Sequence, residues 1–468
     1  MQLPSAFEAR MRSLLKTEYD AFLEALTRED AVKGLRVNPQ KASVEAFEEN
    51  SPFALTPLPY VEGGYIVADE EGAGKHPYHH AGVYYMQDPG AMSTVAALPK
   101  ELFLRDALKI LDLCAAPGGK TTQLAAACAP TGGAVVANEY NASRARILAG
   151  NVERLGLSNV CVTNVDTKYI AQWYPSLFDL VVIDAPCSGE GMFRKNDRAI
   201  EEWSEENVRM CAVRQREILA NGAQTVRPDG YLLYSTCTYA VEENEAVILD
   251  FLKAHPGFSL CPCNASVIAY TADGIEIEGK DGHSLSLCRR FYPHRAAGEG
   301  QFIALLHRDA DATVRREKAK SAIPAVDKRD AAVAEAFLRE TIGRIPEGLL
   351  PCGGMLSIFP HAARLGIAIP PFGLVALGCT LGEVRKGRIV PHHHFFTCFG
   401  QEFSSRAVFS PDGEQIKKYL LGEEVDAGNA RGYSAVLVAL GKETVALGGA
   451  KAADGRLKNY YPKGLRTK

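Results

Sequence analysis

Short apolar runs alternate with amphipathic stretches through the middle of the chain. Apolar stretches of strand length occupy residues 109–113, 134–137, 160–165, 180–183 and 231–234. Stretches with helical periodicity lie between them, at residues 121–127, 143–155 and 204–226. Strands that are apolar throughout are buried on both faces, which is typical of a parallel sheet covered by helices. The pattern therefore predicts a doubly wound α/β sheet, in which ligands bind beyond the carboxyl ends of the strands.

The segments that flank this region differ from it. Residues 1–100 predict a helical start followed by short extended pieces, which form a small lead-in unit before a central domain at residues 101–310. A charged segment and an alanine-rich helix at 327–342 predict a linker helix and a small α/β subdomain over residues 311–380. Residues 381–468 are rich in glycine, proline and short strand-like runs, and they predict a separate β-rich module.

Composition is that of a soluble globular protein. With 468 residues, 47% of them apolar and 23% charged, the chain is long enough for two or three domains with their own cores. The 12 cysteines show no paired disulfide spacing, and the N-terminal residues lack a signal-peptide pattern. We therefore expect a cytoplasmic protein with free thiols and no membrane association.

Charge is distributed unevenly, although the net formal charge is only −4. Residues 311–468 contain 23 Lys and Arg and 16 Asp and Glu, a net charge of +7, whereas residues 1–310 have a net charge of −11. A polyanion would therefore bind mainly on the C-terminal side. Charge alone is equally compatible with a basic surface that is only solvated.

A glycine turn follows the first predicted strand, within the segment Leu111–Thr122. Such a turn lets the backbone approach a ligand and points helix N–H groups at it. We expect every residue of the turn to contact a cofactor: Cys114, Ala115, Ala116, Pro117, Gly118, Gly119 and Lys120. A phosphate-binding P-loop is disfavoured because it requires glycine at position 114, and the Gly-x-Gly-x-x-Gly dinucleotide fingerprint is absent here.

Two carboxylates follow the next two predicted strands. Glu139 lies where a Rossmann-like site places an acid on ribose hydroxyls, and Asp166 is placed to meet an adenine amino group. Each acid alone could instead cap a helix or lie on the surface. Together with the glycine turn they predict a nucleoside-bearing cofactor, and S-adenosylmethionine fits best because it contains adenosine and no phosphate. Arg144, in the helix after Glu139, is a further candidate cofactor contact.

Two cysteines close the last two predicted strands. Cys187 follows Asp184 in Asp-Ala-Pro-Cys-Ser, and Cys237 ends Tyr-Ser-Thr-Cys. Neighbouring strands would bring both thiols to one edge of the cleft, where a thiolate can add to an electron-poor carbon of a pyrimidine ring. A single cysteine is usually a small buried hydrophobe, but both of these lie at strand exits beside polar residues.

Several sequence motifs occur in a fixed order along the chain. The most specific are Leu111–Thr122, Asp184–Gly189, and Tyr234–Thr238 with Glu242–Glu245. Others extend to both sides: Leu35–Pro39, Gln87-Asp88, Arg290–His294 and Gly298–Gly300. Together they resemble the Nol/Nop/Sun family of RNA cytosine-C5 methyltransferases. The C-terminal signatures resemble the bacterial small-subunit rRNA methyltransferase F branch of that family: Leu381–Glu383, Arg388, Pro391–His393 and Lys458–Arg466. The similarity implies a PUA-like end module.

The resemblance implies a Rossmann-like class I methyltransferase sheet, S-adenosylmethionine as cofactor and three catalytic residues. Cys237, in the Thr-Cys motif, would attack cytosine C6, and Cys187, in the Pro-Cys motif, would assist release of the adduct. Asp184 would bind the N3 and amino edge of the ring and also contact the cofactor. DNA cytosine methyltransferases attack with the thiol of a Pro-Cys motif, so the Thr-Cys motif favours RNA.

The resemblance also implies the substrate. We expect a monomer that methylates 16S rRNA, within the small ribosomal subunit or its precursor, and that binds RNA through residues 1–100 and 381–468. Arg194 and Lys195, beside the cleft, are candidate contacts to flanking phosphates. Two alternatives remain open. One is a tRNA cytosine-C5 methyltransferase with the same core, and the other is a non-catalytic rRNA-binding factor of ribosome assembly.

A histidine triplet at residues 392–394 is followed by Cys398. These residue types can bind a metal ion, but no second cluster at ligand spacing accompanies them in the sequence. We therefore predict a strand with polar tips at this position and no metal site.

Overall fold

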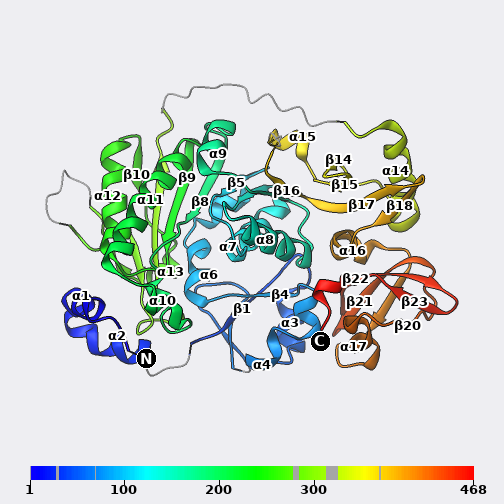
Figure 1. Ribbon diagram of the computed structural model, residues 1–468, viewed down its shortest axis with the longest axis horizontal. Helices are drawn as coiled ribbons and strands as arrows, with labels where there is room; N and C mark the ends of the chain where they lie inside the picture. Colours follow the sequence, from blue (N-terminus) through cyan, green and yellow to red (C-terminus); the bar gives the residue numbers. More distant parts are fainter. Residues whose placement is uncertain are drawn as a thin grey trace.

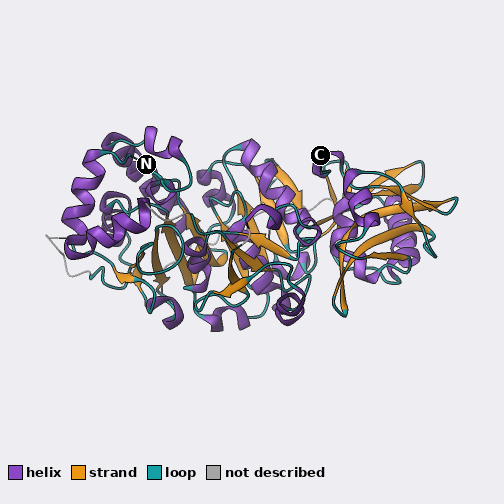
Figure 2. Cartoon of the chain, turned by 90° about the horizontal axis from the view of Figure 1, so that it is seen from below, coloured by secondary structure: helices purple, strands orange, loops and turns teal. Residues whose placement is uncertain are grey.

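The computed structural model describes residues 2–27, 31–68, 70–277, 284–311, 325–367, 370 and 372–467. Figure 1 shows a central sheet with the N-terminal unit beneath it and the C-terminal sheets to one side. In Figure 2 the β-rich C-terminal module forms one end of an elongated molecule. The charged segment expected to be a linker falls mainly at residues 312–324, which lie outside the described residues.

A ten-stranded sheet forms the centre of the protein, in the order β11-β12-β13-β9-β8-β5-β6-β7-β16, with β10 paired to β13. Its parallel strands are β5 (Lys109–Asp112), β6 (Ala134–Asn138), β7 (Val160–Thr163), β8 (Phe178–Asp184) and β9 (Val226–Thr236). All five were predicted from apolar runs, and the doubly wound sheet is confirmed.

Helices cover both faces of this sheet because successive strand residues point to opposite sides. On one face, α11 (Glu205–Ala223) and α12 (Glu245–Ala254) pack on residues such as Leu111. On the other face, α7 (Gly119–Cys128) and α8 (Ala142–Arg154) pack on residues such as Ile110. The strand order reverses between β5 and β8, and a ligand-binding crevice forms at such a switch point.

Antiparallel strands extend the sheet at both edges, and the sequence did not predict them. On one side β13 (Gln301–Arg308) pairs with β9, and β10 (Phe258–Leu260), β11 (Ala272–Asp273) and β12 (Arg289–Phe291) follow. On the other side β16 (Leu374–Leu377) pairs with β7, although it follows α14 in the chain. The central sheet thus incorporates a strand from the expected linker subdomain.

The N-terminal unit combines helices with a small antiparallel sheet. The sheet contains β1 (Gly34–Val37), β2 (Leu55–Pro57), β3 (Gly64–Val67) and β4 (Tyr84–Met86). The helices are α1 (Ser5–Leu15), α2 (Tyr19–Thr27), α3 (Val44–Asn50), α4 (Glu70–Ala73), α5 (Pro77–His80) and α6 (Pro89–Ala96). Shorter helices connect the central strands: α9 (Thr167–Trp173), α10 (Asp197–Glu201) and α13 (Ala265–Ile268).

Two further sheets follow the predicted helix α14 (Lys328–Ile342). The first contains β14 (Leu349–Cys352), β15 (Met355–Ile358), β17 (Cys379–Arg385) and β18 (Arg388–Pro391). The second contains β19 (Arg406–Phe409), β20 (Val425–Asp426), β21 (Gly432–Leu440), β22 (Glu443–Ala453) and β23 (Arg456–Asn459). Helices α15 (Ala362–Leu365), α16 (His393–Phe399) and α17 (Glu414–Leu421) accompany them. The boundary expected after residue 380 falls inside β17.

The strand predicted at the histidine triplet is wrong, because this segment begins α16. His392 caps the helix, with its Nδ1 accepting a hydrogen bond from the backbone N–H of His394 at 3.2 Å. Phe395 and Phe399 lie one turn apart and share a buried cluster with strands β17 and β22. The helical spacing of these apolar residues explains the helix.

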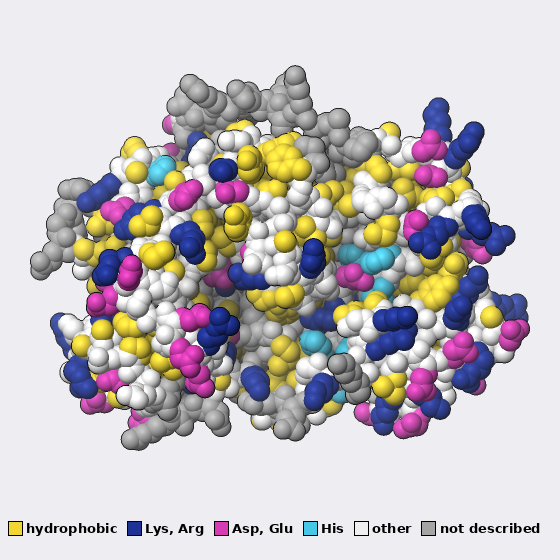
Figure 3. Space-filling model, in the orientation of Figure 1, with side chains coloured by type: hydrophobic (Ala, Val, Ile, Leu, Met, Phe, Trp, Pro, Cys, Tyr) yellow, Lys and Arg dark blue, Asp and Glu magenta, His cyan; other side chains and the backbone are white. Residues whose placement is uncertain are grey.

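Lys and Arg outnumber Asp and Glu in the C-terminal module, by 14 to 9 over residues 381–468. In Figure 3, Lys and Arg side chains project from this module at the right of the view.

Among the described residues, no helix combines the length and the apolar character needed to cross a lipid bilayer.

Candidate active site

A pocket opens where the carboxyl ends of β5 and β8 diverge. It is lined by Tyr85, Met86, Gln87, Asp88, Ala91, Asp112, Cys114, Ala115, Ala116, Pro117, Gly119, Lys120 and Asp184. All but one residue of the predicted glycine turn thus reach the pocket, together with Asp184 from the end of β8. The N-terminal unit supplies one wall through residues 85–91, which the sequence did not indicate.

The glycine turn has a backbone conformation that favours glycine. Gly118 has φ +113°, and a Cβ atom there would lie 3.0 Å from Cδ1 of Leu148. The buried Arg36 fixes the turn from the N-terminal unit, because its Nη2 donates to the carbonyl of Gly119 at 3.3 Å and to Oγ1 of Thr122 at 2.9 Å. The two modules therefore build the pocket jointly.

Lys120 and Asp184 form an ion pair across the pocket. Nζ of Lys120 lies 2.7 Å from Oδ2 of Asp184, and the hydroxyl of Ser235 donates to Oδ1 at 2.8 Å. The lysine is buried, whereas about a third of the Asp184 side chain is exposed. Asp184 is therefore oriented on both oxygens while it still faces the opening.

Asp112, at the end of β5, is a pocket residue that the sequence analysis missed. Burial raises its pKa to about 7, although the hydroxyl of Thr121 donates to its Oδ2 at 2.6 Å and lowers that pKa. Its Oδ1 is buried and has no hydrogen-bond partner among the described residues. An aspartate directly after the apolar residues Ile110 and Leu111 was the signal that could have identified it.

The two cysteine thiols lie side by side. Strands β8 and β9 are parallel neighbours, and Sγ of Cys187 is 3.3 Å from Sγ of Cys237. This confirms that the two strand exits bring both thiols to one edge of the sheet. The hydrogen bond with Cys237 and burial both raise the pKa of Cys187 well above its ordinary value. Cys187 therefore remains a thiol at neutral pH and can donate a hydrogen bond to the neighbouring sulfur.

A buried acid holds the loop that carries Cys187. Glu243 is fully buried and accepts hydrogen bonds from the backbone N–H of Ser188 at 3.0 Å and from the amide of Gln215 at 2.8 Å. It also accepts a bond from the hydroxyl of Ser188. Burial raises the pKa of Glu243. The backbone N–H of Gly191 donates to the carbonyl of Cys237 at 2.7 Å, which ties the two loops together.

The remaining predicted cofactor residues lie beside the pocket rather than in its lining. Glu139 is buried at the end of β6 and accepts from the backbone N–H of Asn141 at 2.9 Å. Arg144 lies 3.7 Å from Glu139 and donates to the carbonyl of Ala116 at 2.6 Å, so it supports the turn. Asp166 caps α9. Direct contacts of Glu139, Arg144 and Asp166 with a cofactor stay predictions.

The two basic residues expected to hold phosphates are both engaged in ion pairs. Arg194 is buried and lies 3.0 Å from Glu299, which leaves it almost no exposed surface for a phosphate. Lys195 is about one-fifth exposed and lies 2.6 Å from Asp88. These residues therefore stabilise the wall next to the pocket.

Three family models match successive parts of the chain. The model described as 16S rRNA methyltransferase RsmB/F matches residues 100–307. The N-terminal domain of 16S rRNA methyltransferase RsmF matches residues 3–89, and the methyltransferase RsmF PUA domain matches residues 406–467. The three matches follow the order of the modules seen in the fold.

Similar proteins extend over nearly the full length. A ribosomal RNA small subunit methyltransferase F of Klebsiella pneumoniae is 32% identical, over 99% of this chain and 96% of its own. One of Vibrio cholerae is 30% identical, over 99% of this chain and 98% of its own.

Solved structures share the fold. A methyltransferase homolog protein from Pyrococcus horikoshii has a TM-score of 0.56 at 26% identity and covers 65% of this chain and 95% of its own. NSun6 from the same organism, solved with SFG, has a TM-score of 0.54 at 20% identity, over 66% of this chain and 98% of its own.

Proposed function

The chain belongs to the 16S rRNA methyltransferase RsmB/F family, and from this premise we propose that it methylates cytosine C5 of small-subunit ribosomal RNA through a covalent cysteine adduct. The neighbouring thiols of Cys187 and Cys237, beside Asp184, are the observation that carries the proposal. A pair of soft nucleophiles next to an acid suits an addition and elimination on a pyrimidine ring.

S-adenosylmethionine is the cofactor of this class of methyltransferase, and the pocket fits it. The turn at residues 114–120 brings backbone close to a ligand, and the unpartnered Oδ1 of Asp112 offers an acceptor for its ammonium group. When bound, the cofactor supplies a methyl group on a positively charged sulfur. The Lys120–Asp184 ion pair borders the same pocket, so the reacting base would lie against its open side.

Cytosine C5 is a poor nucleophile, which explains the need for a thiol. In the proposed reaction the Cys237 thiolate forms a bond to C6, and C5 becomes enamine-like and accepts the methyl group. Solvent water then takes the C5 proton, the C5–H electrons form the C5–C6 double bond, and the C6–S electrons return to Cys237, which restores the aromatic ring and the thiolate. Cys187 keeps its proton at neutral pH, and its thiol can donate a hydrogen bond to the departing sulfur of Cys237, which stabilises the thiolate that leaves.

Asp184 would hold the base during this sequence. Its carboxylate is fixed by Lys120 and Ser235, and its exposed side can accept a hydrogen bond from the exocyclic amine or bind a protonated N3. A base that is stacked in RNA cannot reach this cleft, so the target must be flipped out or unpaired.

The choice of ribosomal RNA rests on the named relatives and on the match to the PUA domain. Methyl transfer from labelled S-adenosylmethionine should be measured with naked 16S rRNA, small-subunit particles and tRNA. Bisulfite sequencing should then find 5-methylcytosine in the ribosomal RNA. The remote variant Cys352→Ala serves as the matched control and should keep its activity. Labelling of tRNA alone, or of no RNA at all, would refute the proposal.

A further inference from the structure

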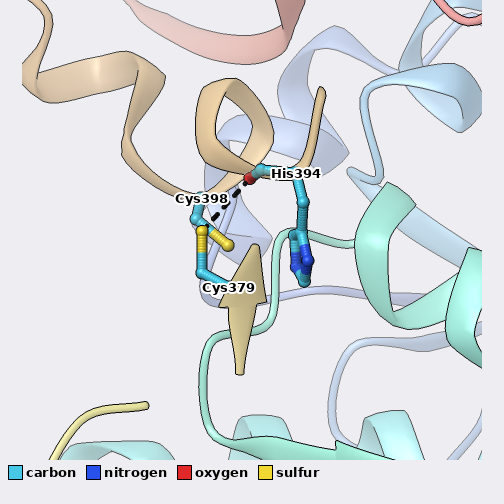
Figure 4. Close-up of side chains that lie close together, drawn as sticks. All are labelled: Cys379, His394 and Cys398. Carbon is cyan, nitrogen blue, oxygen red and sulfur yellow. Dashed lines mark hydrogen bonds between the residues drawn. The ribbon is translucent and has the colours of Figure 1, made fainter. Parts of the chain in front are cut away.

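Cys379, His394 and Cys398 converge outside the pocket, where β17 meets α16 (Figure 4). One ligand atom from each lies within 4.8 Å of the others. Cys379 and His394 are buried, and Cys398 is partly exposed. The cluster plays no part in the proposed methyl transfer. The sequence analysis predicted no metal site at the histidine triplet and Cys398, because the third cluster residue, Cys379, lies on a different element.

The local structure orients all three side chains toward one another. His394 and Cys398 are four residues apart on α16 and therefore share one face of the helix. The backbone N–H of Thr380, the residue after Cys379, lies 3.3 Å from Nδ1 of His394. Nδ1 thus accepts a hydrogen bond from β17, and the buried Nε2, which has no hydrogen-bond partner among the described residues, is the ring nitrogen left for a metal ion.

The spacing suits a tetrahedral zinc ion. Zinc binds cysteine sulfur at about 2.3 Å and histidine nitrogen at about 2.0 Å, so its ligand atoms lie roughly 3.5–3.8 Å apart. The observed limit of 4.8 Å requires movements of about 1 Å or less, which small rotations of the side chains provide. Thiolate and imidazole ligands favour zinc, whereas hard cations such as magnesium and calcium favour oxygen ligands.

The charges of the three ligands are also suitable for a divalent ion. Two thiolates and a neutral imidazole around a divalent ion give a complex with no net charge. The nearby Lys41 ammonium is already held by backbone carbonyls, since Nζ donates to Thr397 and, at 3.1 Å, to Ala446. Its charge thus faces these carbonyl oxygens, and a metal complex with no net charge would not repel it.

We propose that Cys379, His394 and Cys398 bind one zinc ion, with the fourth position taken by water on the exposed side of Cys398. The ion would join α16 to β17 at a junction of modules. Helix α16 packs against β22, and the hydroxyl of Thr397 donates to the carbonyl of Glu153 in the catalytic α8 at 2.7 Å. A bound zinc ion would thus fix the C-terminal module to the catalytic domain.

The metal content of the full-length protein tests this proposal. Protein purified without chelator should contain about one zinc per chain, and Cys398→Ser and His394→Gln should lose most of it. Cys352→Ser, which changes a cysteine of β14 in the same sheet, should retain it. Replacement by cobalt should produce thiolate-to-cobalt absorption in the wild type and in Cys352→Ser, and a much weaker band in Cys398→Ser.

Circular dichroism establishes whether each variant is folded, so a loss of metal can be assigned to a lost ligand. Less than a tenth of an equivalent of zinc in folded wild-type protein, even after equilibration with zinc, would overturn the proposal. Equal zinc in Cys398→Ser and the wild type would overturn it as well. A disulfide between Cys379 and Cys398 in freshly purified protein would show that the pair is a redox site instead.

Discussion

Burial in the pocket changes the pKa of an acidic side chain. Asp112 is the clearest case, because it is fully buried at the cofactor end of β5 and its pKa is raised to about 7. A carboxyl group with a raised pKa binds its proton more tightly in the folded than in the unfolded protein. Its contribution to stability is therefore greatest in acid and is lost as the pH rises toward 7.

Replacing Asp112 by Asn should remove this pH dependence. Between pH 5 and pH 7 the free energy of unfolding of the wild type should fall relative to that of Asp112→Asn by about 2 kcal/mol. Urea unfolding of the cofactor-free proteins at several pH values measures the difference. Parallel pH profiles for the two proteins would show that Asp112 does not titrate in this range.

The places of the catalytic candidates in the fold were easier to predict than the residues that support them. Cys187, Cys237 and Asp184 stand in motifs at strand ends, and such positions reach the same edge of a parallel sheet. The role of Glu243 could not be predicted, because a run of acidic residues does not reveal that one carboxylate is buried against Ser188. Burial depends on packing between elements that are distant in sequence.

Glu243 connects the loop that carries Cys187 to helix α11, through its hydrogen bonds with Ser188 and Gln215. Glu243→Ala should lower the free energy of unfolding by about 2–4 kcal/mol, because buried donors of Ser188 and Gln215 lose their acceptor. Methyl transfer should fall as well, since the loop carrying Cys187 loses its anchor. The exposed neighbour provides the control, and Glu242→Ala should change stability by less than about 0.5 kcal/mol. Equal losses in both variants would contradict this role.

Helix α7 begins after Gly118, whose left-handed backbone conformation favours glycine. Gly118→Ala should destabilise the protein by roughly 1–2 kcal/mol, because φ +113° strains any other residue, and it should weaken cofactor binding. Gly150, exposed within α8, has open space around it, and Gly150→Ala should stabilise the protein by about 0.5–1 kcal/mol. Calorimetry of unfolding and of S-adenosylmethionine binding tests both. Unchanged cofactor affinity in Gly118→Ala would contradict the role of the turn.

Parallel strands were easier to predict than the edges of the sheet. Each of β5 to β9 carries an apolar run that reveals burial on both faces. Strand β16 is a strand because it pairs with β7, which lies more than 200 residues earlier, and no local pattern encodes that contact. Helix α16 was mistaken for a strand because a seven-residue segment is too short for periodicity to separate the two.

The C-terminal module, which has an excess of Lys and Arg over Asp and Glu, lies at one end of the protein (Figure 2). Lys458 and Lys463 are exposed there. Replacing both by Ala should weaken binding of a ribosomal RNA fragment and reduce the salt dependence of log K by about 1 per lysine. Arg209→Ala, on the catalytic domain, is the control for loss of charge. An unchanged salt slope in the double variant would exclude this surface from the RNA interface.

The pocket itself is shared between modules, because the N-terminal unit supplies Arg36 and the wall at residues 85–91. The central domain supplies the glycine turn and Asp184, and the thiols of Cys187 and Cys237 lie outside the pocket lining. Such sharing is consistent with a match to the RsmF N-terminal domain that is followed directly by the match to the RsmB/F methyltransferase region.

Covalent trapping distinguishes the roles of the two thiols. Each variant is incubated with S-adenosylmethionine and ribosomal RNA and then analysed on a denaturing gel. Cys187→Ala should accumulate a protein–RNA adduct because release is impaired, and Cys237→Ala should form none because the attacking thiol is absent. An adduct formed by Cys237→Ala, or none formed by Cys187→Ala, would contradict the proposed mechanism.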